Sequence, residues 1–339
     1  MKTITIIGGG VTGLALGIAL RHRGVPVTLY ENHCYPHHRV CGELICGVQS
    51  ETLKRLGVLH HLVDAEQCSS TGWYFREKLA YQNNLTIAAF GISRYLLDFR
   101  LSRNFRKVGG HLKPDAYFQS SDTRNHGQVW ASGRKADSNS SWLGIKMHCK
   151  NLPLTHDLEF HFGDHGYVGL NRIEDQLVNV CGVFLKRPEL ENGQNSLLAY
   201  MAKCGLNQLT KRMLQSNPDP ASIAQIDHLS FYSNRSKQNR LTLGDRYCSA
   251  PAFTANGISM AFESAEIAVD PLVYYAKGAI SWEEAQISIE SGLAKRFTKR
   301  LRYARYLHPF VLRPKWQQLL VKAVQTGLLQ FHSVVRATR

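Results

Sequence analysis

The chain has 339 residues, of which 44% are hydrophobic and 20% charged, a composition typical of globular proteins with one or two domains. No apolar stretch is long enough to span a membrane, and the first apolar run begins at Ile4, which leaves no room for a signal peptide. The eight cysteines show no paired C-x-x-C zinc spacing and favour free thiols in a reducing compartment, so we expect a cytoplasmic protein.

The chain begins with a strand–turn–helix signature. Residues 4–7 are a continuous apolar run, as expected of a strand that is buried on both faces of a parallel sheet. Gly8, Gly10 and Gly13 follow with the spacing G-x-G-x-x-G. In this motif the first glycine allows a sharp turn, the second lets the backbone approach a pyrophosphate, and the third lets the next helix pack closely on the strand. The signature therefore predicts a dinucleotide site.

A helix over residues 13–23 and a strand over residues 26–30 complete this unit, and Glu31 ends the strand. A carboxylate at this position accepts hydrogen bonds from a ribose diol and repels a 2′-phosphate, so it favours FAD or NAD over NADP. The alternative is a glycine-rich tight turn without a ligand, which the acidic strand end disfavours.

The next segment is rich in histidine. His33, His37 and His38 lie close together in the sequence and could suggest a metal site. No carboxylate or thiol stands at a fixed helical spacing from them, so we interpret the segment as a solvated loop and predict no metal. A helix is expected to follow over residues 50–57.

Two strand-like runs, residues 72–75 and 85–90, are separated by polar residues and predict a hairpin. Ser93 is placed to cap a helix that runs to about Val108 and stops at two glycines. A polar segment follows, and then a short strand over residues 129–134.

Alternating apolar and polar residues dominate the middle of the chain. Four strands are predicted in succession, at residues 143–148, 158–162, 166–170 and 177–184. Strands that follow one another across short turns are typical of an antiparallel sheet. We expect a helix to follow over residues 196–214.

The last third of the chain returns to short, buried elements. Residues 240–245 predict a strand that ends in an acidic turn, residues 251–257 a loop, and residues 258–269 a helix. The remainder is predicted to be helical, with a break at residues 308–314.

Taken together, these motifs resemble the FAD proteins of the p-hydroxybenzoate hydroxylase and geranylgeranyl reductase superfamily, which have the glutathione-reductase type of FAD fold. The resemblance extends to about residue 275. It rests on the glycine signature with Glu31, on Arg94 in Ser-Arg-x-x-Leu-Asp, on Gly244-Asp245, on Pro251, and on Gly257 at the start of a helix. The resemblance implies these cofactor-binding residues: Gly8, Gly10, Val11, Thr12, Gly13, Glu31, Asn32, Arg39, Cys41, Gly42, Arg94, Gly244, Asp245, Pro251, Asn256, Gly257 and Ile258.

The loop Val40-Cys41-Gly42-Glu43 is similar to the Cys-Gly-Glu loop of the geranylgeranyl-reductase-like branch. So are the runs Gly144-x-Lys146-x-His148, 166–169 and 179–182. The resemblance implies catalytic positions at Cys41, as a thiol beside the flavin, and at Pro251, over the flavin ring. The alternative for Cys41 is a small residue that only packs against the cofactor.

The fold implied is α/β, with a Rossmann-like FAD-binding domain built on a parallel sheet, an inserted antiparallel sheet as substrate domain, and a helical C-terminal region. The expected FAD-binding domain comprises residues 1–70, 93–135 and 236–275. The substrate domain comprises residues 71–92 and 136–235, and the basic helical region residues 276–339.

The implied function is that of an FAD-dependent oxidoreductase acting on a lipophilic or aromatic small molecule, by hydroxylation or by double-bond reduction. No second nucleotide signature is present, so NAD(P)H or another electron donor would bind transiently. A halogenase is disfavoured because the chain lacks a Trp-x-Trp-x-x-Pro segment. The competing class is a flavin-binding protein without turnover, which Arg246, Tyr247 and Ala252 suggest because the family usually carries other residues there.

The C-terminal segment is strongly basic. Residues 291–339 contain eleven Lys or Arg and no Asp or Glu, together with apolar and aromatic residues that include Tyr303, Trp316 and Phe331. Such helices can lie on an anionic membrane surface, which would place the protein at the inner face of the membrane. An equally weighted interpretation is a helical cap that packs on the FAD-binding domain. Nucleic acid is disfavoured because nothing beyond charge resembles a recognition motif.

Overall fold

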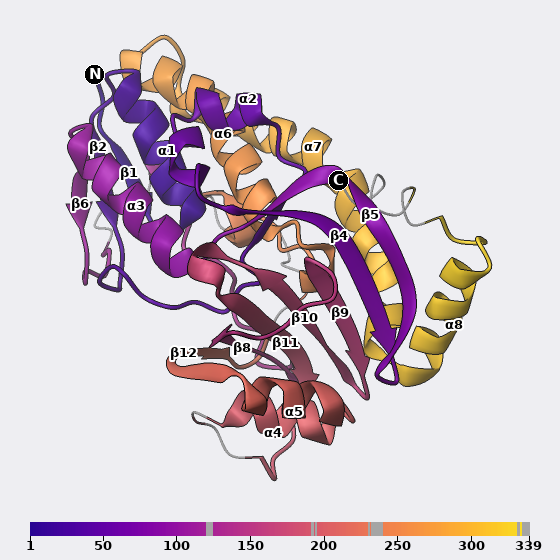
Figure 1. The fold of residues 1–339 in the computed structure, drawn as a ribbon. Helices are drawn as coiled ribbons and strands as arrows, with labels where there is room; N and C mark the ends of the chain where they lie inside the picture. Colours follow the sequence, from indigo (N-terminus) through magenta and orange to yellow (C-terminus); the bar gives the residue numbers. More distant parts are fainter. Residues whose placement is uncertain are drawn as a thin grey trace.

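The computed structural model describes residues 1–119, 125–190, 193, 195–229, 231, 240–330 and 333, and it folds them around two sheets (Figure 1). The smaller, sheet A, has the strand order β13–β7–β1–β2–β6, and all its pairs are parallel. Its strands are β1 (Ile4–Ile7), β2 (Val27–Tyr30), β6 (His111–Lys113), β7 (Gln128–Trp130) and β13 (Leu241–Thr242). The predicted parallel sheet is confirmed, with β6 as an additional edge strand.

Three helices cover sheet A: α1 (Val11–His22), α3 (Arg94–Lys107) and α6 (Gly257–Lys277). Apolar residues of the helices and strands form the largest hydrophobic core of the molecule. Ser93 caps α3 as predicted, because its hydroxyl accepts a hydrogen bond of 3.0 Å from the backbone N–H of Leu96. The short helix α2 (Ser50–Arg55) packs against α6.

The larger sheet, sheet B, has eight strands in the order β12–β8–β11–β10–β9–β4–β5–β3. They are β3 (Leu44–Cys46), β4 (Glu66–Phe75), β5 (Lys78–Gly91), β8 (Trp142–Lys150), β9 (Leu158–Gly163), β10 (Gly166–Arg172), β11 (Val178–Leu185) and β12 (Asn217–Ile226). The predicted hairpin is β4–β5, and the four predicted strands pair antiparallel. Because β4 joins β9 in parallel, the sheet is mixed rather than purely antiparallel.

Register defines two faces of sheet B. Lys146 of β8, Cys181 of β11, Gly169 of β10, Phe160 of β9 and Trp73 of β4 are direct partners in one row that crosses five strands. We call the face that carries this row the inner face. The opposite, outer face is apolar over β8, β11 and β10, where it packs against two helices.

These helices, α4 (Ser196–Lys203) and α5 (Asn207–Gln215), lie below sheet B in Figure 1. The single helix predicted over residues 196–214 is therefore wrong. The chain breaks at Gly205, whose φ of 79° belongs to the left-handed region that glycine adopts easily. The break lets both short helices turn their apolar sides to the sheet.

The C-terminal region contains α7 (Trp282–Leu312) and α8 (Pro314–Gln325). A capping box of Ser281 and Glu284 starts α7. The predicted break over 308–314 is confined to Arg313, whose extended backbone separates the two helices. Within the described ranges, no helix is long and apolar enough to cross a membrane.

The predicted cap is present, but it covers more than sheet A. Helix α7 is tied to α6 because Arg296 and Arg300 both bind the buried carboxylate of Glu263. Helix α8 lies against sheet B, where the buried Gln317 donates to the backbone oxygen of Gly163 at 2.9 Å. Phe331, Arg336 and Arg339, which belong to the predicted basic segment, lie outside the described residues.

Candidate functional site

The glycine turn after β1 has the geometry that its sequence predicts. Gly8 has a φ of 109°, and a Cβ there would lie 2.4 Å from the carbonyl oxygen of Ala131. A Cβ on Gly13 would lie 2.0 Å from the oxygen of Gly8, so both positions require glycine. Gly10 is different, because a Cβ there would meet only the guanidinium of Arg94, at 3.4 Å. The turn is therefore tight on two sides and open at Gly10, beside the N-terminus of α1.

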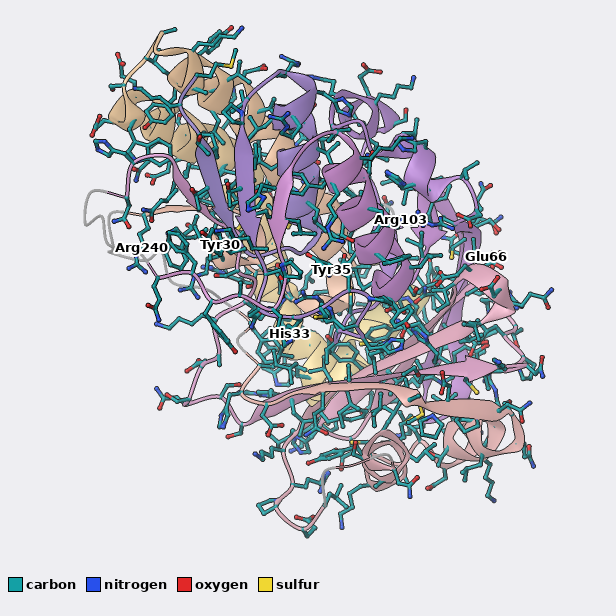
Figure 2. All side chains as sticks on the ribbon, turned by 90° about the vertical axis from the view of Figure 1, so that its left-hand side faces the viewer. Tyr30, His33, Tyr35, Glu66, Arg103 and Arg240 are labelled. Carbon is teal, nitrogen blue, oxygen red and sulfur yellow. The ribbon has the colours of Figure 1, made fainter. Side chains whose placement is uncertain are left out.

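Glu31 lies at the end of β2 and is buried. Its Oε2 accepts a hydrogen bond of 2.7 Å from the N–H of Gly9, and its Oε1 accepts one of 3.2 Å from the N–H of His33. The hydroxyl of Tyr35 donates to the carbonyl oxygen of Gly9 at 2.5 Å. Figure 2 shows Tyr35 and His33 between the two halves of the molecule. The carboxylate is thus fixed against the glycine turn, with acceptor capacity left on its oxygens.

Two arginines lie beside this turn. Arg94 forms a two-point ion pair with Asp98, with Nη2–Oδ2 and Nε–Oδ1 distances of 2.6 and 2.8 Å. Arg39 lies 3.2 Å from Glu31 and 3.4 Å from Asp98. These contacts involve its Nη2 and Nε atoms, respectively, so Arg39 is held beside the turn by two carboxylates.

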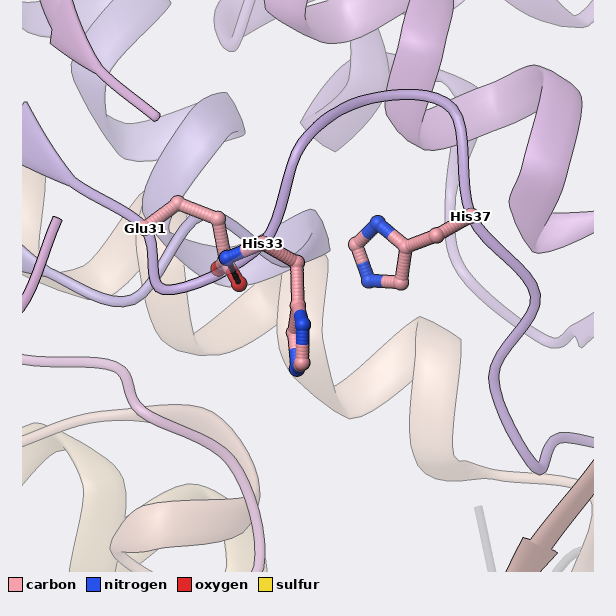
Figure 3. A group of neighbouring side chains, drawn as sticks. All are labelled: Glu31, His33 and His37. Atoms are coloured by element: carbon pink, nitrogen blue, oxygen red, sulfur yellow. Dashed lines mark hydrogen bonds between the residues drawn. The ribbon is translucent and has the colours of Figure 1, made fainter. Parts of the chain in front are cut away.

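The three histidines of the loop separate. Figure 3 shows His33 and His37 beside Glu31, and one ligand atom from each of these three residues lies within 4.8 Å of the others. A divalent cation there would have to share Glu31 with the guanidinium of Arg39, which disfavours it. His38 lies elsewhere, stacked on Tyr95 at 4.5 Å. The absence of a metal stays a prediction.

A second loop, after β13, meets the glycine turn. Gly244 has a φ of 59°, and a Cβ there would lie 2.3 Å from the hydroxyl of Thr12. Asp245 lies 3.6 Å from Arg134 and is partly exposed. Tyr247 packs against the core of sheet A. The turn at Gly244-Asp245 is therefore formed, although the sequence analysis found Arg246 and Tyr247 unusual at the positions that follow it.

Pro251 leads into a short 3₁₀ helix over Ala252–Thr254, and α6 begins just beyond it with Asn256 as N-cap. Nothing lies within 4 Å of a Cβ placed on Gly257, so there is open space beside the first residue of α6. The side chain of Ile258 is buried in the core, as is that of Val11 at the start of α1, so only their backbone groups could face a ligand. Asn32 is exposed at the start of its loop.

Cys41 lies between the two sheets. Its carbonyl oxygen accepts a hydrogen bond of 3.0 Å from the side-chain amide of Asn179, on β11, and its Sγ accepts one of 3.3 Å from the N–H of Glu43. Burial raises the pKa of the Cys41 thiol, so the thiol stays protonated at neutral pH. Nothing lies within 4 Å of a Cβ placed on Gly42. This geometry favours a packing role for Cys41 over a nucleophilic one.

An apolar cavity of about 110 Å³ opens on the inner face of sheet B. Its walls include Trp73, Phe160 and Phe162 from the sheet, Phe253 from the loop after Pro251, and Leu320 and Val324 from α8. No charged side chain of the described residues lines it, and the polar side-chain groups among its lining residues are threonine hydroxyls, the Cys46 thiol and the indole N–H of Trp73. The inserted sheet was expected to form a substrate domain, but no motif located this cavity, because its walls come from several segments that lie far apart in the chain.

The structure brings the sequence-predicted site residues together from two parts of the chain, the N-terminal third and the segment from Gly244 to Ile258. The glycine turn, Glu31, Arg39 and Arg94 meet at the carboxyl end of sheet A, and Cys41 with Gly42 continues this line towards sheet B. The Gly244–Ile258 segment joins them through the contact between Gly244 and Thr12. Sequence reasoning assigned no role to Glu43 or Lys146, which are fully buried here, and the resemblance gave the only signal for them.

Comparisons with known proteins agree with this architecture. Residues 6–40 match the family described as NAD(P)-binding Rossmann-like domain. A stretch of 144 residues is 24% identical to Conditioned medium factor receptor 1 of Dictyostelium discoideum; the match covers 38% of this chain and 28% of that protein. The chain therefore matches well under a third of the length of this curated relative.

Solved structures match over nearly the whole chain. The flavin-dependent brominase Bmp2 has a TM-score of 0.77 at 14% identity, covering 99% of this chain and 93% of that one. HpxO of Klebsiella pneumoniae, complexed with FAD and uric acid, has a TM-score of 0.74 at 13% identity, with coverage of 99% and 95%. PqsL of P. aeruginosa, complexed with 2-aminobenzoylacetate, has 0.73 at 13%, with coverage of 93% and 98%. The chain thus has the α/β fold that these flavin-dependent proteins share.

Proposed function

We propose that this protein is an FAD-dependent oxidoreductase that acts on a lipophilic or aromatic small molecule. The observation that carries the proposal is a juxtaposition. The segment from Gly244 to Ala255 begins at the glycine turn, where Gly244 meets Thr12, and it ends in the wall of the apolar cavity. A dinucleotide-type turn and an uncharged cavity therefore share one loop, which is the arrangement that a cofactor and an apolar substrate need in order to meet.

The residues present fit FAD. The open side of Gly10 leaves room for a pyrophosphate at the N-terminus of α1, and the guanidinium of Arg39 lies beside this turn, next to Glu31. Glu31 would hold the adenosine ribose and Asp245 the ribityl chain. The N-terminus of α6 would favour negative charge on the reduced ring. FAD supplies the two-electron chemistry when it is bound.

The cavity supports an uncharged substrate. A charged group buried there would have no partner among the residues that line it, and burial without a partner is costly. HpxO with uric acid and PqsL with 2-aminobenzoylacetate show that the fold accommodates small cyclic molecules. Among the two chemistries, we place hydroxylation first, since the solved structures of this fold include PqsL, described as a probable FAD-dependent monooxygenase. Double-bond reduction is the second candidate.

The absorbance spectrum of the purified protein tests the proposal. We expect a yellow protein that binds FAD and whose flavin is bleached anaerobically by NADH or NADPH. Mixing the reduced protein with dioxygen in a stopped-flow instrument then separates the chemistries. A transient absorbance phase before reoxidation supports hydroxylation, and direct reoxidation supports reduction. A colourless protein that cannot be reconstituted with FAD contradicts the proposal, and one that binds FAD without being reduced is a flavoprotein without turnover.

We further propose that the outer side of α7 and α8 contacts an anionic membrane surface. Over residues 291–330 the chain carries nine Lys or Arg and no Asp or Glu. Tyr303, Tyr306, Trp316 and Leu319 are exposed among these charges, while the buried side of α8 lines the cavity. Basic and aromatic residues on one exposed side are typical of interfacial helices, and each cation contributes about 1 kcal/mol near an anionic surface. A substrate could then enter from the bilayer.

Co-sedimentation with liposomes tests this surface without removing the cap. The variant carrying Trp316→Ser and Leu319→Ser changes only exposed side chains, so the fold is expected to persist. We expect binding to phosphatidylserine liposomes at low salt, and at least fivefold less binding by the variant. Equal and negligible binding by both proteins would leave α7 and α8 as a cap alone.

A further inference from the structure

Four ionisable side chains meet where the loop before β3 crosses the inner face of sheet B. Lys146 and His148 project from alternate positions of β8, and His38 and Glu43 come from the loop. The ammonium of Lys146 lies 3.0 Å from Nδ1 of His38, 2.8 Å from Nε2 of His148 and 3.4 Å from Oε1 of Glu43. Nε2 of His148 also lies 2.6 Å from Oε2 of Glu43.

Burial makes this group unusual. Lys146 and Glu43 are both 0% exposed and His148 is 3% exposed, whereas His38 is only half-buried. A buried ion pair contributes little net stability compared with well-packed apolar residues, so stability alone does not explain why the chain keeps it. Glu43 also has a φ of 52°, in the left-handed region that non-glycine residues rarely adopt. The backbone is therefore bent in the way that brings this carboxylate to the two residues of β8.

The hydrogen bonds of His148 cannot all exist at once. A ring nitrogen either carries a proton and donates, or carries a lone pair and accepts. Nε2 has two close partners, a lysine that donates and a carboxylate that accepts. It can accept from Lys146 when it is unprotonated, and donate to Glu43 once it is protonated. The geometry thus offers one proton two positions.

The outer and inner ends of the group face different surroundings. Burial, followed by the charges of Lys146 and His148, lowers the pKa of His38 to about 4, although Glu43 and Asp219 oppose this effect. Its ring is therefore neutral at pH 7 and can accept from Lys146. Burial alone would raise the pKa of Glu43, but the hydrogen bond of His148 and the charges of Lys146 and His148, with a backbone bond from Arg94, hold it below its usual range. Glu43 is thus ionised at neutral pH and offers a carboxylate oxygen to the Nε2 proton of His148.

The inner end reaches the proposed reaction compartment. The backbone N–H of Glu43 donates to Sγ of Cys41, and Lys146 is the direct cross-strand partner of Cys181. The same row continues through Gly169 to Phe160 and Trp73, which line the apolar cavity. The group therefore joins the half-buried ring of His38 to the face on which the substrate would lie.

We propose that His38, Lys146, His148 and Glu43 form a proton-transfer chain between solvent and the inner face of sheet B; this rests on the proposed function for its use. Lys146 gives a proton to Nε2 of His148. The uncharged Lys146 then takes the Nδ1 proton from the Nδ1–H tautomer of His38, while Nε2 of the same ring takes a proton from water and leaves hydroxide in the solvent. His148 then passes the Nε2 proton to Oε2 of Glu43. One proton enters from water and one is delivered to Glu43, which passes it on to the compartment, and no electron moves.

The test uses His38→Gln, because the half-buried position tolerates the change and the amide oxygen can still accept from Lys146, while the side chain cannot carry a proton. Tyr95→Phe is the matched control, since it keeps the ring that stacks on His38. In ¹⁵N-histidine-labelled protein without FAD, we expect the exchange of the His148 Nε2 proton with water to slow at least tenfold in His38→Gln. We expect Tyr95→Phe to change it by less than twofold.

Equal exchange rates of the His148 Nε2 proton in the wild type and in His38→Gln would contradict the proposed proton-transfer chain. A second readout uses the FAD-loaded protein, in which the solvent deuterium isotope effect on the slowest proton-coupled phase should at least double in His38→Gln and return on addition of imidazole. A wild-type isotope effect and no response to imidazole would contradict the proposal. If NAD(P)H does not reduce the loaded wild type, the proposed function fails, yet the exchange rates still decide whether the chain exists.

Discussion

The two ends of the inner face of sheet B are built from the same row of paired residues, yet they hold opposite chemistry. At one end Lys146 and His148 are buried beside a carboxylate, and at the other Phe160 and Trp73 line an uncharged cavity. Strand alternation places all of them on one face but does not set their polarity. What differs is the segment that covers each end: a loop carrying His38 and Glu43 covers the first, and α7 with α8 covers the second.

Between the two ends lies Gly169. It is in the interior of a strand, and a Cβ there would meet only the carbonyl oxygen of Cys181, at 3.9 Å. Glycine inside a strand weakens the strand and marks a place where a ligand or another backbone approaches closely. Gly169 therefore leaves a gap in the row of side chains between the charged end and the apolar end. An apolar substrate in this gap would lie close to the groups proposed to transfer protons.

The largest expected effect is at the charged end. Lys146→Met should lower the free energy of unfolding by about 3–5 kcal/mol, because it leaves the carboxylate of Glu43 buried without its cation. Adding Glu43→Gln should restore at least half of the loss. Urea denaturation followed by circular dichroism measures both values. A single variant within about 1 kcal/mol of the wild type would mean that the pair is not buried as described.

At the apolar end, acid should act through His308, which is buried and stacks on Phe253 with a ring distance of 5.7 Å. Burial, followed by Arg134, lowers its pKa from 6.5 to about 4. Folding therefore favours the neutral ring, so its contribution is complete above about pH 6.5 and is lost as the pH falls towards 4. The loss is roughly 3 kcal/mol. Stability of His308→Phe, measured from pH 7 to 4, should fall by less than that of the wild type; parallel curves would contradict the assignment.

A smaller effect is expected outside the inner face. Glu31→Ala should weaken FAD binding by roughly 1.5–3 kcal/mol, since it removes a charged acceptor for the ribose, and this corresponds to roughly 10- to 150-fold in affinity. Asp245→Ala should act likewise at the ribityl chain. Glu51→Ala, which changes an exposed acid on α2, is the control. Retention of FAD by Glu31→Ala through dialysis, equal to that of the control, would remove Glu31 from the site.

Local patterns predicted much of sheet A and its helices because their signals are short-range. The glycine spacing, the strand end at Glu31 and the Ser93 cap each lie within a few residues of the structure that they specify. Strand β12 was missed since Pro218 and Pro220 interrupt its alternation, which is tolerated at the edge of a sheet. Strands β3 and β6 were also missed.

The site was predictable only in part, for a related reason. His38 appeared to group with His33 and His37, its neighbours in the sequence, but it points to Lys146, which lies 108 residues further along the chain. The cavity wall likewise joins β4 and β9 to α8. Such contacts depend on how the sheets and helices pack, and no local spacing records them.

Gly169→Val tests most directly whether cofactor and substrate meet on the inner face. The added side chain enters open space, and valine suits a strand. The free energy of unfolding, measured by urea denaturation, should therefore stay within about 1 kcal/mol of the wild-type value. Gly166→Val, in the same strand, should instead destabilise the fold, because its Cβ would lie 2.8 Å from the oxygen of Val183. We predict that Gly169→Val folds but loses FAD retention or NAD(P)H oxidation by at least 100-fold. A folded Gly169→Val protein with wild-type FAD content and turnover would contradict the account.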